Sequence, residues 1–125
     1  MKKFSSSWKS SKKQRKQRKY RFKAPLHIKQ KFVSSHLSKE LRKKYGKRNV
    51  SLRKGDKVKI MRGQFKKHEG KIDRIDLKKT RAFVSGVEIT KRDGSKKQLA
   101  LYPSNLMIIE LNMDDKLRQQ SLGGK

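Results

Sequence analysis

The sequence contains no cysteine, which excludes disulfide frameworks and zinc sites built from thiolates. It also has no apolar run approaching the roughly 18 residues that a membrane-spanning helix needs. Phe4 and Trp8 stand alone near the start, without the apolar stretch of a secretory signal. We therefore expect a cytoplasmic protein that has no membrane partner.

Acidic residues are scarce, and they are scarcest at the start of the chain. The first fifty residues contain one acid, Glu40, against nineteen Lys and Arg, and the whole chain has a formal net charge of +28. Residues 12–23 are the densest part, with eight cations in twelve positions. Because so much like charge repels itself and buries little surface, we expect an irregular arm over residues 1–23 when the chain is free. Its natural counter-charge is a phosphate backbone.

Only 31% of the residues are hydrophobic, too few for one core around all 125 residues. The core is expected in the C-terminal half, within about 60 residues, a size at which single domains are marginally stable. Binding to a partner can supply the missing stability by mass action. We divide the chain into a basic arm (1–23), an extension with short helices (24–49), a β domain (50–111) and a C-terminal tail (112–125).

One or two short helices are predicted in the extension. Pro25 is suited to open a helical turn, with Ile28 and Phe32 four residues apart on one side. Ser38 is a suitable N-cap for a clearer helix that would end at Gly46. At about two turns, this helix needs tertiary contacts to persist.

The second half of the chain is predicted to be mainly β. The spacing of Ile72 and Ile75 breaks strict alternation, which indicates a bulge or a strong bend, and Asp93-Gly94 is a two-residue hairpin signal. Five short strands in about 60 residues favour a small closed or half-closed antiparallel barrel. Strands are expected at residues 57–61, 71–77, 81–91, 98–102 and 106–111. Expected core residues are Val58, Ile60, Ile72, Val84, Val87, Ile89, Leu99, Leu101 and Ile108.

A charged loop between two of these strands gives the first motif. Residues 53–72 resemble the KOW motif, a strand–loop–strand unit of small RNA-binding barrels in ribosomal proteins and transcription elongation factors. Gly63 and Gly70 bracket the loop, where we expect positive φ or close backbone approach. Phe65 suits packing inside the loop as well as stacking on a base. The cationic or titratable side chains of the loop are Arg62, Lys66, Lys67 and His68.

The segments around this motif narrow the resemblance. Residues 22–28, 37–45 and 102–106 match, in order, the archaeal and eukaryotic family of a universal large-subunit ribosomal protein, the twenty-fourth in bacterial numbering. The likeness runs from about Ser6 to about Leu117. The chain ends at Lys125, whereas cytosolic eukaryotic relatives usually continue into a longer basic tail, which favours an archaeal or reduced eukaryotic source.

This resemblance implies a structural constituent of the large ribosomal subunit in the cytoplasm. It implies a small SH3-like five-stranded barrel, binding to the 5′ region of the large ribosomal RNA early in assembly, and a place near the polypeptide exit tunnel. Partners would be that RNA and neighbouring large-subunit proteins, with no cofactor and no homo-oligomer. The expected ribosomal RNA-binding residues are Lys12, Lys13, Arg15, Lys16, Arg18, Lys19, Tyr20, Arg21, Lys23, His27, Arg62, Gly63, Lys66, Lys67 and His68.

The sequence departs from the family at Lys67, where relatives usually have glycine. If the site demands positive φ, lysine costs about 1 kcal/mol or more there. Either the loop takes another path in this chain or an RNA contact holds it.

Catalysis and metal binding have little support in the sequence. His27, His36 and His68 lack metal-ligand spacing, and Asp73 and Asp76 would lie on opposite faces of a strand among cations. The sequence has no Ser, His and Asp in the order of a catalytic triad and no glycine-rich phosphate-binding loop. We therefore expect that the protein is not an enzyme.

Three other interpretations of the chain remain open. The arm could be a solubilising tail or a localisation signal, although Trp8, Tyr20 and Phe22 favour stacking on unpaired bases. A transcription elongation module would also use a KOW barrel. A nucleoid-compacting protein would bind duplex DNA as tightly as RNA.

Overall fold

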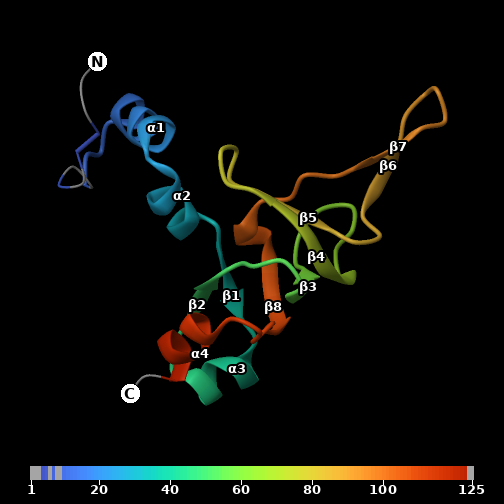
Figure 1. The fold of residues 1–125 in the computed structure, drawn as a ribbon. Coiled ribbons are helices and arrows are strands. Elements are labelled where there is room, and N and C mark those ends of the chain that lie inside the picture. Colours follow the sequence, from blue (N-terminus) through green and yellow to red (C-terminus); the bar gives the residue numbers. More distant parts are fainter. Residues whose placement is uncertain (1–3, 6, 8–9, 124–125) are drawn as a thin grey trace.

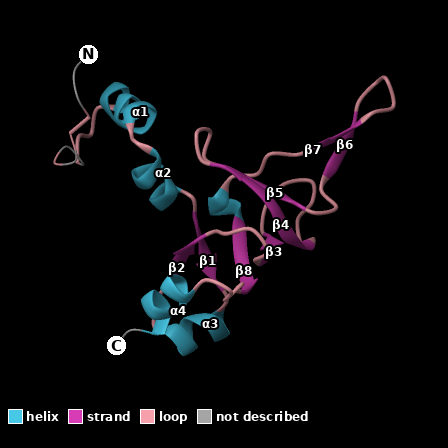
Figure 2. Cartoon of the chain, viewed as in Figure 1, coloured by secondary structure: helices cyan, strands magenta, loops and turns pink. Residues whose placement is uncertain are grey.

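The computed structural model describes residues 4–5, 7 and 10–123, and it shows a mixed helical and β fold (Figures 1 and 2). The sheet lies centrally, α1 and α2 extend from it towards the N-terminus, and the β6–β7 hairpin projects away on another side. The elements are α1 (Gln14–Lys23), α2 (Leu26–Phe32), β1 (Ser34–Leu37), α3 (Lys39–Tyr45), β2 (Asn49–Ser51), β3 (Lys57–Ile60), β4 (Glu69–Asp76), β5 (Arg81–Val84), β6 (Glu88–Thr90), β7 (Lys96–Gln98), a 3₁₀ turn (Pro103–Asn105), β8 (Leu106–Glu110) and α4 (Lys116–Gly123).

The prediction of an irregular arm was wrong for Gln14–Lys23, which forms α1. Charge density alone predicted disorder, but Gln, Arg and Lys are also good helix formers, and that preference prevails here. The aromatic ring of Tyr20 in α1 contacts two other rings. Its centroid lies 4.9 Å from the centroid of Phe4 and 6.1 Å from the centroid of Phe32. No residue of α1 is buried, so the helix lies on the surface of the protein.

The two helices predicted in the extension are confirmed. Pro25 is the N-cap of α2. The Ser38 hydroxyl caps α3 by accepting a hydrogen bond from the Leu41 N–H, and Gly46 ends that helix at φ 63°.

The structure also has two strands that the sequence did not predict, β1 in the extension and β2 at the junction between the extension and the β domain. In the six-stranded sheet, whose order is β2-β1-β8-β3-β4-β5, β1 pairs parallel with β8 and antiparallel with β2. The sheet is therefore not wholly antiparallel. Four-residue β1 is too short for a periodicity signal, and its Ser-Ser-His-Leu sequence has little β preference.

Within the β domain, the predicted irregularities are present. The ladder between β4 and β5 shifts register between Ile72 and Arg74, which confirms the bulge. The long strand expected over residues 81–91 is divided into β5 and β6, with Gly86 at φ 78° between them. The β6–β7 turn differs from prediction because Lys91 and Ser95 close a three-residue loop, with Gly94 at φ 83°.

The core lies between the sheet and its flanking segments. Seven of the nine predicted core residues are buried, whereas Leu99 is half-buried and Ile89 is 45% exposed. The prediction for Ile89 was wrong because the β6–β7 hairpin extends beyond the sheet (Figure 1). The extension adds Val33 and Leu37 to the core, which also contains Leu52, Ala82 and Leu106.

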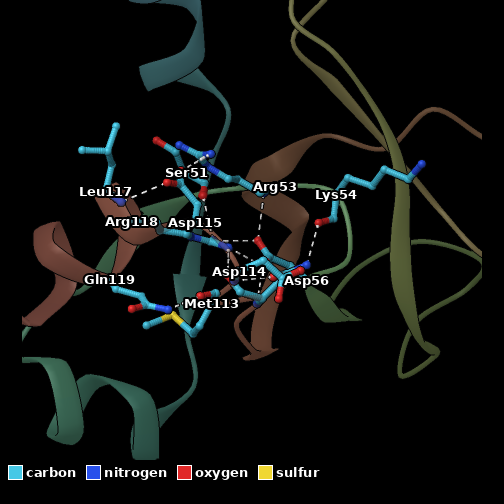
Figure 3. Close-up of polar contacts among 11 residues, drawn as sticks. Ser51, Arg53, Lys54, Asp56, Met113, Asp114, Asp115, Leu117, Arg118 and Gln119 are labelled. Carbon is cyan, nitrogen blue, oxygen red and sulfur yellow. Dashed lines mark hydrogen bonds and ion pairs between the residues drawn. The ribbon is translucent and has the colours of Figure 1, made fainter.

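The C-terminal tail is anchored by a buried ion pair (Figure 3). Arg118 of α4 donates to both carboxylate oxygens of Asp56, at 2.6 Å and 2.8 Å, and the two side chains are 4% and 0% exposed. The same carboxylate accepts the backbone N–H groups of Arg53 and Asn112, each at 2.8 Å. This arrangement holds the tail on the turn that leads into β3.

Candidate RNA-binding surface

The first cationic surface is α1 with the two lysines that precede it. All eight Lys and Arg of residues 12–23 are exposed, and the segment contains no acid. Helical folding places these cations around one short rod that projects from the sheet (Figure 1). An exposed surface of this kind suits the phosphates of a nucleic acid backbone.

The aromatic residues of the arm have different surroundings. Phe22 is 82% exposed, so its ring is accessible to an unpaired base. Tyr20 is half-buried between Phe4 and Phe32, a position in which it anchors α1 to α2. Trp8 lies outside the described residues.

The second cationic surface is the β3–β4 loop of the KOW segment. Arg62, Lys66 and Lys67 are exposed, as is Gly63 at φ 96°. The loop is closed at its base because the Lys67 N–H donates to the Ile60 carbonyl at 2.8 Å. A short, closed loop therefore presents three cations on a defined backbone.

Other residues of this loop support its shape. The His68 ring is half-buried, with Nε2 3.2 Å from the Ser85 carbonyl, which places it at the base of the loop. Phe65 is half-buried and packs against the core, which favours the packing interpretation over base stacking. Gly70 allows close approach, since a Cβ there would lie 2.8 Å from the Ser85 carbonyl oxygen. Gly63 and Gly70 are therefore positions of backbone geometry, as expected.

Lys67 adopts φ 72°, so the loop keeps the conformation that glycine would favour. Lys67 therefore carries the left-handed backbone strain that the sequence analysis raised for this position. The closing hydrogen bond from Lys67 to Ile60 helps to hold this strained residue in place.

We predict that Lys67→Gly stabilises the free protein by about 0.5–1 kcal/mol, because relief of left-handed strain exceeds the entropy that glycine adds to the unfolded chain. Lys66→Gly is the matched control. It removes the same charge from a neighbour without positive φ, and should destabilise by about 0.5–1 kcal/mol. Urea unfolding of both variants measures the difference; a loss of stability in Lys67→Gly contradicts the strain.

The structure does not bring the predicted residues together into one patch. The cations of α1 and the β3–β4 loop lie on separate sides of the sheet, and His27 is exposed on α2 (Figure 1). A partner that contacts both surfaces must therefore be large and extend around the domain.

Sequence reasoning missed a third cationic region at the β4–β5 turn and a fourth on the β6–β7 hairpin. Lys78 and Lys79 are exposed at the turn, next to half-exposed Arg81. Their adjacency in the sequence was the available signal, but it was interpreted only as charge balance for Asp73 and Asp76. The hairpin presents Lys91, Arg92, Lys96 and Lys97.

The hairpin contains two acids, Glu88 at the start of β6 and Asp93 in the turn. Hydrogen bonds from the Ser95 hydroxyl, and then from its backbone N–H, lower the pKa of Asp93 below its usual value. Asp93 is negatively charged at neutral pH and offsets part of the positive charge at the hairpin tip, and the lowered pKa extends this charge to more acidic pH.

The acids and histidines of the described part of the chain do not gather into a catalytic or metal-binding arrangement. Residues 4–5, 7 and 10–123 contain no cluster of three or more potential ligands that could hold a metal ion. Asp73 accepts a hydrogen bond from Gln98, and Asp76 accepts the backbone N–H of Lys79 in the turn, so both have structural partners. Within the same residues, no helix is long and apolar enough to cross a membrane.

Comparison with known proteins finds similarity to ribosomal proteins. The sequence model of the family that unites the eukaryotic ribosomal proteins L26 with their archaeal counterparts, numbered 24, matches residues 11–125. The large ribosomal subunit protein uL24 of Methanoculleus marisnigri is 48% identical over 114 residues, which cover 91% of this chain and 94% of that protein. The protein of the same name from Methanosphaera stadtmanae is 44% identical over 115 residues, or 92% and 98%.

Proposed function

Because the chain belongs to the family of eukaryotic ribosomal proteins L26 and their archaeal counterparts, we propose that it binds large-subunit ribosomal RNA through its cationic surfaces. The family is structural, so the chain is a structural protein of the large subunit of the cytoplasmic ribosome, and not an enzyme. The proposal for RNA is carried by one observation: eight exposed cations in residues 12–23, with no acid among them.

Electrostatics dominates the proposed binding. Each phosphate neutralised by Lys or Arg lowers the logarithm of affinity by about 0.7–0.9 per tenfold rise in salt. The β3–β4 loop and α1 contact different parts of the folded RNA, because they lie on separate sides of the sheet. Every residue that the sequence predicts to bind ribosomal RNA is part of this proposal, including His27 on α2, which lies outside the two surfaces.

The finer details of the proposal come from the family. The chain binds the 5′ region of the large ribosomal RNA early in assembly, lies near the polypeptide exit tunnel beside other large-subunit proteins, and is not a homo-oligomer. Its β domain is a half-closed SH3-like barrel. The antiparallel ladders β8-β3-β4-β5 and the bridge between Ala82 and Leu101 support that architecture, since the bridge links β5 to the segment that leads into β8.

Sedimentation tests the ribosomal assignment. The tagged chain is expressed in an archaeal host, and the ribosomal particles are washed at high salt. The chain should then migrate with large subunits on a sucrose gradient. Migration with RNA polymerase would support the transcription elongation alternative. Equal affinity for duplex DNA and ribosomal RNA would support nucleoid compaction, and either result overturns the proposal.

The contribution of the loop can be measured separately. Replacing Arg62, Lys66 and Lys67 with alanine should flatten the salt dependence of binding to ribosomal RNA by about 2–3 logarithmic units per tenfold change in salt. The barrel should remain folded because all three side chains are exposed.

A charge-matched control for the loop variant lies on α3. Alanine at Lys39, Lys43 and Lys44 removes the same charge from exposed sites away from the loop. This control should change the salt slope less, as measured by filter binding at four salt concentrations. Equal slopes would show that only total charge matters, and unfolding of the loop variant would show that the loop is structural.

A further inference from the structure

A groove lies between α1 and α2 on one side and the β4–β5 turn on the other, away from the β3–β4 loop. Its volume is about 1000 Å³, and segments far apart in the sequence line it: α1, α2, residues 78–81 and residues 102–104. The Lys29 ammonium of α2 donates to the Lys78 carbonyl at 3.4 Å, which connects the two walls. The groove is therefore formed by the folded chain rather than by one exposed loop.

The charge of the groove has a single sign. Seven Lys and Arg are among the described residues that line it, and no acid is among them. Arg18 and Arg21 come from α1, whereas Lys78 and Lys79 come from the opposite wall, and all four are exposed. A chain of phosphates that runs between the walls would meet cations on both sides.

Exposed rings accompany this charge. Tyr102 is 54% exposed, and the Arg81 guanidinium carbon lies 3.3 Å from its ring centroid, so the two groups form a stacked pair that lines the groove. Phe22 of α1, 82% exposed, lines it as well. Aromatic rings and guanidinium planes are the surfaces on which unpaired RNA bases stack.

We propose that this groove binds a single-stranded segment of RNA, with an unpaired base stacked on the Arg81–Tyr102 pair and its phosphates held by the cations of both walls. This proposal rests on the proposed function, and it adds that the groove beside the β4–β5 turn binds RNA in its single-stranded form. A duplex presents its phosphates and a shallow minor groove but keeps its bases stacked inside, so it makes no use of exposed Tyr102 and Phe22. An acidic protein segment would satisfy the cations but has no bases for the rings.

The test uses the full chain and a single-stranded oligoribonucleotide with one 2-aminopurine, whose fluorescence falls when the base stacks. Tyr102→Ala should weaken binding about fivefold to a hundredfold and abolish the quenching. Tyr102→Phe should retain both because it keeps the ring. Leu117→Ala, which removes another exposed large side chain on α4 outside the groove, should leave binding unchanged.

Several results would overturn the proposal. One is equal affinity of Tyr102→Ala and the unaltered chain for the oligonucleotide. Another is equally effective competition by inorganic polyphosphate or duplex RNA, which would show binding by charge alone. Competition by polyglutamate at the same concentration would indicate a protein partner.

Sedimentation separates this proposal from the ribosomal assignment. If the unaltered chain migrates with large subunits but Tyr102→Ala binds the oligonucleotide normally, only the groove proposal fails. If the unaltered chain does not migrate with large subunits, the ribosomal assignment fails whatever the groove binds.

Discussion

Replacing Arg118 with alanine is expected to lower the free energy of unfolding by about 3–5 kcal/mol. The substitution leaves the Asp56 carboxylate fully buried without its cation, although the carboxylate keeps the N–H groups of Arg53 and Asn112. Because each kcal/mol shifts the melting temperature of a small domain by about 4–8 °C, the melting temperature should fall by about 12–40 °C. Calorimetry or circular dichroism measures this shift.

An exposed ion pair nearby provides the matched control. Arg53 and Asp115 lie 2.5 Å apart, but their side chains are 44% and 31% exposed, so Arg53→Ala should cost no more than about 1 kcal/mol. Asp56→Ala should resemble Arg118→Ala, and the double variant should lose less than the sum of the two. Additive losses, or an Arg118→Ala effect as small as that of Arg53→Ala, would contradict a buried lock between tail and sheet.

Removal of residues 1–23 should have the largest effect on RNA binding. The arm carries the eight cations of residues 12–23, so its loss should flatten the salt slope by several logarithmic units, more than the loop variant does. Stability of the free protein should change by less than about 1 kcal/mol, because α1 buries no residue. Filter binding and thermal unfolding measure the two effects on the same preparation.

A full-length variant separates the effect of the arm's positive charge from the effect of removing the arm itself. Glutamine at all eight cationic positions keeps the helix-forming preference of α1 and the Tyr20 contacts with Phe4 and Phe32. It should lose most of the RNA affinity that the deletion loses, because the only further cations that the deletion removes are Lys2, Lys3 and Lys9. If it binds like the unaltered chain, the aromatic residues rather than the cations attach the arm. A large fall in melting temperature after deletion would show that the arm stabilises the sheet.

Much of the fold was predictable because strong local signals coincided with the tertiary structure. Ser38 and Gly46 cap α3 as the sequence indicated, and alternation placed Val58 and Ile60 in the core. The spacing of Ile72 and Ile75 predicted a bulge or strong bend, and the β4–β5 ladder shifts register there. In each case a few adjacent residues determine the local structure.

The features that were missed depend on contacts between distant segments. Nothing near Arg118 in the sequence shows that it pairs with Asp56, sixty-two residues earlier. The strand β1 exists because β2 and β8 lie on either side of it, and Ile89 is exposed because its hairpin extends beyond the sheet. The structure is therefore a mixed helical and β fold, whereas the sequence predicted a mainly β fold.

Positive charge identified most of the candidate RNA-binding residues in the sequence. The sequence did not show how these residues group in the folded protein. The cations of α1 and those of the β3–β4 loop lie apart. The groove beside Tyr102 joins α1 to the β4–β5 turn, a juxtaposition that no spacing in the sequence reveals.

The salt dependence of affinity for a ribosomal RNA fragment tests the central claim most directly, because phosphate contacts determine its slope. With six or more contacts from α1, the loop and the groove, we predict that affinity falls by about 10³-fold or more between 50 and 200 mM salt. An affinity for the same fragment that changes less than about threefold over that range would contradict binding through these cationic surfaces.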